Sequence, residues 1–567
     1  MRTKSIIGLA AATLISACVS AGTDNTISEP SETQSVAQSE HKKSAVETEL
    51  TSRAQRIKKD VTYLSSDLLE GREAGSAGHA VAVNYVIEQF KEIGISPMGD
   101  NGGYVQTVPL ISVMREDEGN VLSISSRSGE AISLTDGEDY IVSASSAGEQ
   151  TSVEAPVVFA GYGIVAPEHG LEPYKNLDVD GKIVAILAGS PAGIQTEERA
   201  YYGAQVAREM SERGAVGVIT IETPVRAKRV SFKQSIQRAT TSPSMKWIKA
   251  DGDAYTTSPN LKASAYVSMV GAEKLFEGAE LSWPEILAII EDETANVSSF
   301  EMPISAKIEQ NSKHEQITSD NVIGYIEGSD PALKEEVIAL SAHIDHIGIT
   351  RKSMAKDVIN NGALDNAAGV STLLEVARII KSGERPRRSI LFTVVTAEEK
   401  GLLGAQYFAQ NPTIERKRIV GNVNLDMPVL TYDFTDVVAF GGERSTMKAA
   451  IEDAIADFGV SLGEDPFPAQ GLFTRSDHYR FVEIGVPSVF LATGFENGGE
   501  EAWSNHFANN YHKPSDEVDN GVLFNVADKF ASINAKIAIT LANQDDRPLW
   551  IKDDFFALRF GGEMQSQ

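Results

Sequence analysis

The sequence predicts an α/β fold, a three-layer αβα sandwich. Unbroken apolar runs in the second half of the chain suit strands that are covered on both faces, and they span residues 337–342, 390–396, 419–425 and 487–492. Segments of helical character fill the gaps between and after these runs, at residues 366–380, 404–409, 447–458 and 526–541. Strands alternating with helices from Asn321 onward are typical of a sheet with a helical layer on each face.

The middle of the chain predicts a second, smaller α/β unit. Short strands are expected at residues 156–160, 182–187 and 215–221, with a helix at residues 204–213 and glycine turns between them. Before this unit, residues 80–93 have helical spacing and Gly94 ends the helix. We therefore expect a main domain made of residues 46–130 and 301–560, with residues 131–300 inserted into it.

The composition is that of a globular protein of more than one domain. The 567 residues are 42% hydrophobic, which is enough to bury a sizeable core. The formal net charge of −28 argues against nucleic-acid binding and against nonspecific adsorption to anionic lipid, because both need a basic face. No nucleic-acid partner is expected, and the sequence carries no prediction of oligomeric state.

The first residues predict an exported lipoprotein. A basic start precedes a short apolar core at residues 6–15, and a membrane span would need about 20 apolar residues. Cys18, the single cysteine of the chain, ends a stretch that resembles a lipobox. We expect a signal peptide at 1–17, a lipid on Cys18, a disordered tether at 18–45, and an anchor in the bacterial cell envelope. The alternative is an ordinary secretory signal with an incidental cysteine.

Metal-capable side chains follow the predicted strands of the main domain. His343 follows the first strand, Glu398 and Glu399 the second, and Asp426 the third, while the loop after the fourth leads on to His512. In open α/β sheets, ligands bind outside the carboxyl ends of the strands. Residues spread over about 170 positions of the chain are thus expected to meet in one crevice.

These residue types suit a pair of zinc ions. Zinc accepts imidazole nitrogen and carboxylate oxygen, and two ions about 3.5–4 Å apart can share one carboxylate. Asp365, at a helix start among small residues, is our choice for the shared ligand, although alone it would more often be a helix cap. Glu398 and Glu399 point in different directions, so one can bind metal and the other act as a base. Asp345 either orients a ligand imidazole or is a surface carboxylate.

Taken together, these residues resemble the co-catalytic di-zinc exopeptidase family of bacterial leucine aminopeptidases and glutamate carboxypeptidase II. The resemblance covers residues 321–540, and residues 46–110 show a weaker similarity to the same family. It is carried by Ser341-Ala342-His343-Ile344-Asp345-His346, Asn361-Gly362-Ala363-Leu364-Asp365-Asn366, Thr396-Ala397-Glu398-Glu399, Asn424-Leu425-Asp426-Met427 and Tyr511-His512-Lys513-Pro514-Ser515-Asp516.

The resemblance implies a role for each of these residues. His343 and Asp426 would hold one zinc ion, and Glu399 and His512 would hold the other. Asp365 would bridge the two ions. Glu398 would be the general base and Asp345 would support the ligands, so both are counted with the catalytic residues. The central sheet would be mixed and mostly parallel.

The resemblance also implies a cis peptide bond at Asp365-Asn366 and identifies the middle unit as similar to a noncatalytic protease-associated domain. The sequence departs from the family at Leu364, where many members have a second Asp that is not a ligand. It departs again at Met427-Pro428, which would reshape the pocket wall.

Other polar motifs near the site have more than one interpretation. Ser476-Asp477-His478 is contiguous, so it cannot easily form a nucleophilic triad and is interpreted as pocket wall or structural hydrogen bonding. The family has a similar run near its substrate, which makes His478 a candidate substrate contact. Trp503, His506 and Phe507 either line the mouth of the site or form a packed loop.

The predicted function is that of an exported zinc aminopeptidase that hydrolyses peptides. The alternatives of the same fold are a carboxypeptidase, which would need cationic groups around its pocket, and a glutaminyl cyclase, which uses one zinc. A noncatalytic receptor-like protein is the alternative from another class.

Overall fold

Adjacent parallel strands form the centre of the main sheet. They are β12 (Val337–His343), β15 (Ser389–Val395), β16 (Ile419–Asn424) and β19 (Ser488–Thr493). β12 lies between β15 and β16, and β16 also pairs with β19, always in parallel. Every residue of these strands is buried. The strands predicted from unbroken apolar runs are therefore confirmed, with ends that differ by at most one residue. The computed structural model describes residues 49–191, 193–292, 296–351 and 353–566.

Antiparallel strands extend this sheet on both sides and make it mixed. β11 (Phe300–Ile326) runs antiparallel to β15, and β17 (Asp436–Phe440) runs antiparallel to β19. β18 (Ser461–Gly463) adds to β17 at one edge. At the other edge β11 pairs with β1 (Ser96–Pro97) and β2 (Val105–Arg115), and β2 pairs in turn with β9 (Ser244–Trp247).

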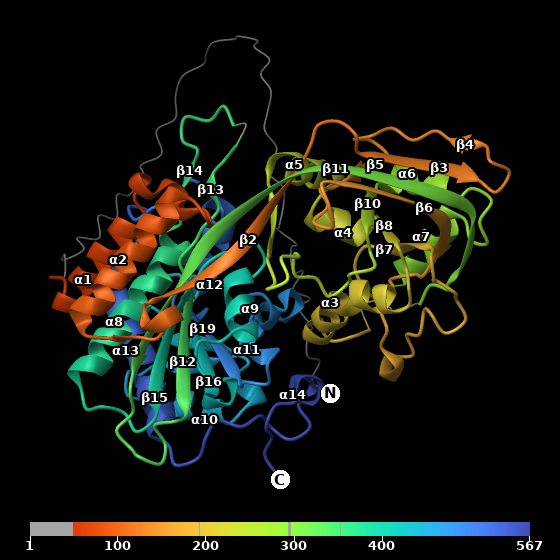
Figure 1. Cartoon of the computed structure of the whole chain (residues 1–567). Helices are drawn as coiled ribbons and strands as arrows, with labels where there is room; N and C mark the ends of the chain where they lie inside the picture. Colours follow the sequence, from red (N-terminus) through yellow and green to blue (C-terminus); the bar gives the residue numbers. More distant parts are fainter. Residues whose placement is uncertain (1–48, 192, 293–295, 352, 567) are drawn as a thin grey trace, which may run out of the picture.

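Helices cover both faces of the sheet, as the three-layer prediction requires (Figure 1). One layer contains α1 (Ser52–Leu64), α2 (Ala77–Ile93), α8 (Ala368–Ser382), α10 (Met447–Ala456) and α13 (Phe524–Asn543). The other contains α9 (Leu403–Gln410) and α11 (His478–Val482). β12 shows why an unbroken apolar run is needed. Its Leu340 joins the core under the first layer, whereas its Ala339 joins Phe408 and Phe481 under the second.

The middle of the chain builds a second sheet with its own cores. β6 (Gln150–Phe159), β7 (Ile183–Leu187), β8 (Gly217–Ile221) and β10 (Ala263–Val267) are parallel neighbours. β5 (Tyr140–Val142) flanks β10, and on the other side β11 lies between β6 and β3 (Val121–Ser126), which pairs with β4 (Ala131–Ile132). The helices of this unit are α3 (Thr196–Glu212), α4 (Pro224–Arg229), α5 (Phe232–Thr241), α6 (Met269–Leu275) and α7 (Trp283–Glu291). Two separate apolar clusters lie on the two faces of this sheet.

β11 joins the two sheets. This strand is 27 residues long, and Figure 1 shows it crossing from one unit to the other beside β2. Its first half pairs with β3 and β6, and its second half pairs with β2 and β15. β11 was not predicted from the sequence, because most of the strand alternates between buried and partly exposed residues and so contains no long unbroken apolar run. The domain limits stay a prediction.

The predicted lipoprotein signal, Cys18 and the tether up to residue 45 lie outside the described residues. Within the residues that the structure describes, no helix is long and apolar enough to cross a membrane.

Truncating the centre of β12 tests the two-faced core. Leu340→Ala should lower the free energy of unfolding by about 2–5 kcal/mol, because Leu340 is fully buried and its removal leaves a cavity. Leu558→Ala is the control, since Leu558 is 55% exposed and its loss should change little. Denaturant titration of both variants measures the difference, and equal losses would contradict the assigned packing.

Candidate metal centre

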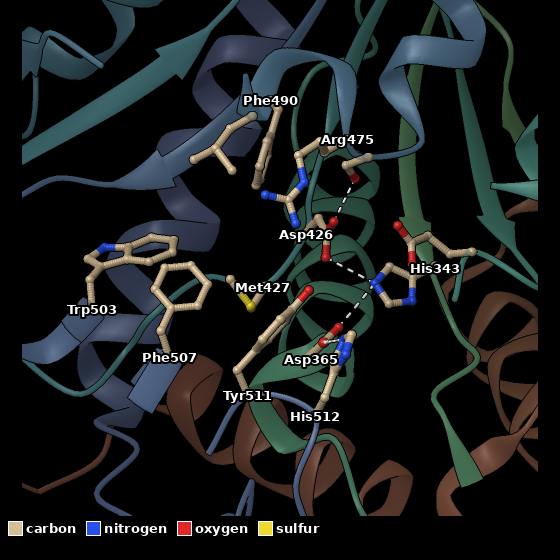
Figure 2. Close-up of a pocket in the computed structure, with 13 residues that line it drawn as sticks. His343, Asp365, Asp426, Met427, Arg475, Phe490, Trp503, Phe507, Tyr511 and His512 are labelled. Atoms are coloured by element: carbon tan, nitrogen blue, oxygen red, sulfur yellow. Dashed lines mark hydrogen bonds and ion pairs between the residues drawn. The ribbon is translucent and has the colours of Figure 1, made fainter. Parts of the chain in front are cut away.

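The carboxyl ends of neighbouring strands bring the predicted ligands together. His343 is the last residue of β12, Glu399 follows the end of β15 by four residues, and Asp426 follows β16 by two. These strands are parallel neighbours, so their carboxyl ends lie along one edge of the sheet. His512, which follows α12 (Gly499–Asn509), and Asp365, in the helical turn η4 (Ala363–Ala367), complete the group (Figure 2).

His343, Asp365 and Asp426 form the first candidate metal site. The imidazole Nε2 of His343 lies 3.0 Å from Oδ1 of Asp426 and 3.3 Å from Oδ1 of Asp365. Donor atoms bound to one zinc ion in a tetrahedron, at bonds of about 2.0–2.1 Å, lie roughly 3.3 Å apart. The spacing of these three donors therefore suits one small cation.

The second candidate site is on the other oxygen of Asp365. His512 Nε2 lies 3.2 Å from Oδ2 of Asp365 and 3.2 Å from Oε2 of Glu399. His346 Nδ1 lies 2.8 Å from Oε1 of Glu399, so this imidazole belongs to the same group. Asp365 turns one oxygen to each site, which is the geometry expected of a shared ligand.

Hydrogen bonding around His343 shows why the first site suits a cation. Its Nδ1 is 3.1 Å from the backbone carbonyl of Asp345, which can only accept, so Nδ1 donates there. In neutral imidazole, Nε2 then carries a lone pair that faces the carboxylates of Asp365 and Asp426. Burial opposes protonation of His343, but Asp426 and Glu398 outweigh it and hold the pKa of the imidazole well above its usual range. A proton or a metal ion on Nε2 is therefore needed to offset the repulsion between its lone pair and the two carboxylates.

The second site contains buried polar atoms without hydrogen bonds. Both ring nitrogens of His346 and Oε1 of Glu399 are buried and form no hydrogen bond among the described residues, because the 2.8 Å approach of Nδ1 to Oε1 lacks hydrogen-bond geometry. Burial would raise the pKa of Asp365, yet the imidazoles of His343, His346 and His512 outweigh it and hold this pKa well below its usual range. Unpaired nitrogen and oxygen donors at this spacing fit zinc, which binds both kinds of atom.

The sequence analysis did not count His346 among the ligands. This imidazole is fully buried and sits three residues after His343, beyond the end of the same strand. The signal was present, because a second histidine in that motif suggests a second donor. Its contact with Glu399 depends on the fold of the loop after β12 and could not be read from spacing.

Asp345 acts on the site through the backbone. Its carboxylate accepts hydrogen bonds from the amides of Glu398 at 3.0 Å and Glu399 at 3.3 Å, while its Oδ1 is 3.9 Å from Nδ1 of His343. Burial raises the pKa of Asp345 to about 6, although His343 lowers it. Asp345 is therefore buried and not at the surface, and it holds the turn that presents both glutamates.

Glu398 lines the pocket beside His343 and Asp426. Burial raises the pKa of Glu398 well above its usual range, and the carboxylates of Asp426 and Glu399 raise it further, against the opposing effect of His343. A carboxyl group with a raised pKa beside candidate metal ligands has the properties of a general base.

The carboxylate of Asp516 holds the loop before α8 in place. Asp516 accepts hydrogen bonds from the amides of Leu364 at 3.1 Å and Asp365 at 3.0 Å. Leu364 is buried in the main apolar core. It belongs to neither candidate metal site, so this departure from the family pattern removes no metal donor. The expected cis peptide bond at Asp365-Asn366 is present.

Comparison with known proteins identifies the segment that carries this site. Residues 321–538 match the model of "Peptidase family M28". The match covers less than half of the chain, and it contains all the residues of both candidate metal sites.

Similar curated proteins match over part of their length. Probable leucine aminopeptidase 2 of Aspergillus oryzae is 28% identical over 232 residues, which cover 38% of this chain and 44% of that protein. Aminopeptidase YwaD of Bacillus subtilis is 29% identical over 210 residues, covering 36% and 40%. The chain thus spans less than half the length of these relatives. Among solved structures, an aminopeptidase from Aneurinibacillus sp. strain AM-1 is similar, with 20% identity, a TM-score of 0.49, and coverage of 87% of this chain and 95% of that one.

Away from the candidate ligands, the wall of the pocket is largely apolar (Figure 2). Apart from Glu398, Ser476 and the candidate ligands, its lining residues are Met427, Leu472, Arg475, Phe490, Trp503, Phe507 and Tyr511. Trp503 and Phe507 therefore belong to the pocket wall, which the sequence had left open. Met427, one of the departures from the family pattern, is part of this wall.

The Ser476-Asp477-His478 run lies behind and beside the metal site. Ser476 donates to Oδ2 of Asp426 at 2.6 Å and accepts from Asn424 at 2.7 Å, which confirms structural hydrogen bonding. His478 is fully buried, and its ring packs against Phe473 and Phe490. Burial lowers the pKa of His478 to about 4, so it is neutral at physiological pH. A contact between His478 and substrate stays a prediction.

Asp345→Asn tests the backbone support of the glutamate turn. The amide retains one acceptor oxygen where the carboxylate uses both, so one of the two hydrogen bonds is lost. Loss of such an outer partner should lower metal affinity or activity roughly ten- to hundredfold. Chelator competition with zinc and measurement of kcat/KM on the same preparation check the effect. Unchanged values for both quantities would contradict the role.

Proposed function

We propose that this protein is a zinc-dependent aminopeptidase that removes N-terminal residues from peptides. The observation that carries the proposal is the position of Asp365, whose two oxygens face two separate groups of zinc-compatible donors. Glu398 lies next to them on the pocket wall.

The donors divide between two zinc ions per chain. His343 and Asp426 would hold one ion and Glu399 and His512 the other, with Asp365 between the two groups of donors. When bound, a pair of zinc ions supplies the Lewis acidity that hydrolysis of a peptide carbonyl requires. His346 is a further donor on the side of Glu399.

Glu398 moves the proton in this scheme. It takes a proton from the attacking water and delivers it to the departing amine, so a single carboxylate serves both half-steps. Asp345 keeps Glu398 in place through the hydrogen bond to its amide.

The pocket supports an aminopeptidase that prefers apolar first residues. Its aromatic and aliphatic wall, which includes Met427, Phe490 and Trp503, suits an apolar side chain. The carboxylates around the metal site suit the positive charge of a free α-amine. The aminopeptidase names of the similar curated proteins support the same assignment.

The assay for this proposal compares free and blocked N-termini. The full chain loaded with zinc should hydrolyse leucine p-nitroanilide, should leave N-acetyl-leucine p-nitroanilide intact, and should cleave glutamate p-nitroanilide slowly. Elemental analysis should give two zinc ions per chain. One ion together with cyclisation of N-terminal glutamine would identify a glutaminyl cyclase, and no bound zinc would identify a receptor-like protein.

Glu398→Gln tests the base. This variant should lower kcat by about a hundred- to ten-thousandfold while both zinc ions remain bound, because a neutral amide cannot accept the proton. Steady-state kinetics and elemental analysis measure the two quantities. Turnover near the wild-type rate would reject Glu398 as the base.

A carboxypeptidase is the second candidate, and Arg475 is the observation that favours it. Arg475 lines the pocket, where it could pair with a C-terminal carboxylate, whereas Arg480 is engaged with Glu483 at 2.9 Å. An N-acetylated dipeptide with a free C-terminal glutamate separates the two activities. Its cleavage, with the aminoacyl anilides left intact, would assign the carboxypeptidase.

We further propose that the protein is exported and lipid-anchored through Cys18, and that residues 131–300 are a noncatalytic protease-associated domain. Within the described residues, both candidate metal sites lie outside this middle unit, which supports a noncatalytic part. Cys18→Ala should shift the protein from the membrane fraction to the soluble fraction of the cell envelope and remove the lipid from its N-terminal peptide. Fractionation and mass spectrometry measure both, and a wild-type peptide without lipid would contradict the anchor.

A further inference from the structure

The side chain of Arg72 lies behind the metal centre, although it comes from the opposite end of the chain. It ends the turn η1 (Asp67–Arg72), ahead of α2, and it is 1% exposed. We propose that Arg72 is the positioning residue that holds the two ligand-bearing loops of the metal centre in place. The inference rests on the proposed zinc function and adds a residue that none of the metal-site motifs contains.

The guanidinium of Arg72 donates to backbone carbonyls from both loops. Its Nε lies 2.9 Å from the oxygen of Ile344, which stands between the metal-site residues His343 and His346. Its Nη1 and Nη2 lie 2.7 Å and 3.1 Å from the oxygens of Asn361 and Gly362, which lead into Asp365. One rigid fork therefore spans the loop after β12 and the loop before α8.

The rest of the turn reinforces this clamp. The backbone oxygen of Arg72 accepts from the amide of His346 at 3.3 Å, and Nη1 also donates to the oxygen of Leu64 at the end of α1. Gly71 has a φ of 69°, and a Cβ there would lie 2.4 Å from the oxygen of Asn360. Only glycine lets the turn approach this closely.

Arg72 is held by carbonyl groups and not by a salt bridge. Among the described residues, no carboxylate lies within ion-pair distance of its guanidinium, while Asp345, Asp365, Asp516 and Glu399 lie close enough to act on its charge. Burial lowers the pKa of Arg72 to about 10, against the opposing effect of these carboxylates, so it stays protonated at neutral pH. A planar fork with five fixed donors suits this geometry, and the single ammonium of lysine does not.

Loss of the Arg72 contacts should lower zinc affinity directly, and turnover should fall as a result. The donors of a metal site bind tightly when their backbones are held in place, and loss of an outer partner lowers metal affinity or activity roughly ten- to hundredfold. Arg72→Lys keeps the charge and loses the fork, so its zinc affinity separates positioning from simple charge balance.

The experiment measures zinc affinity of the full chain by competition with a chelator, without substrate. Arg72→Lys and Arg72→Gln should both bind zinc roughly ten- to hundredfold more weakly than wild type. Arg388→Lys is the matched control, because Arg388 is also fully buried and donates to the backbone oxygens of Gln544 and Asp545, on the edge of the sheet away from the ligands. It should lose stability in calorimetry and keep its zinc affinity.

Several outcomes would overturn the inference. Zinc affinity of Arg72→Lys equal to wild type would reject it, and so would an equal fall in Arg388→Lys. If the Arg72 variants do not fold, Asp67→Ala tests a second contact between the same turn and the loop before Asp365, because the exposed Asp67 carboxylate accepts from the side-chain amide of Asn361 at 2.8 Å. Unchanged zinc affinity in that variant would then reject the clamp. Failure of the wild type to bind zinc would instead reject the proposed function.

Discussion

The arrangement of the metal centre depends on one buried carboxylate, Asp365, whose two oxygens face two groups of donors. Asp365 faces His343 on one side and His512 on the other, in a region that also contains Asp426, Glu398 and Glu399. So many negative groups in a poorly solvated place repel one another, and the arrangement persists only where cations or hydrogen bonds offset the repulsion. The surrounding chain supplies hydrogen-bond donors and acceptors that fix each group: the carbonyl of Asp345 for His343, and the hydroxyl of Ser476 for Asp426.

The parallel centre of the sheet makes this concentration possible. Strand ends that are adjacent in space deliver donors from distant parts of the sequence to one edge, while layers of helix on both faces keep the strands rigid. Rigid elements place donor atoms more precisely than loops do. Outside the strands, the amide of His346 is contacted by the backbone oxygen of Arg72, and Asp365 follows the carbonyls of Asn361 and Gly362 that the Arg72 side chain contacts.

The middle unit reaches the pocket wall through side-chain contacts. Glu197 of α3 pairs with Arg444, which also pairs with Asp554 at 2.8 Å near the end of the chain. Thr196 lies against Gly471, directly before the segment that carries Leu472 and Arg475 into the pocket. β11 adds a continuous strand between the two sheets. The position of the middle unit and the shape of one pocket wall are therefore physically connected.

The sequence by itself determined the buried strands and most of the candidate donors, because both leave local signals. A strand covered on both faces must be apolar at every position, as β12 and β15 are, and a donor at a strand end stands directly after such a run. The tertiary structure alone decided the pairing of those donors, the inclusion of His346, the course of β11 and the position of Arg72. Each of these depends on contacts between segments far apart in the chain, such as Arg72 with Asn361, and side-chain spacing within one segment carries no information about the segment it will meet.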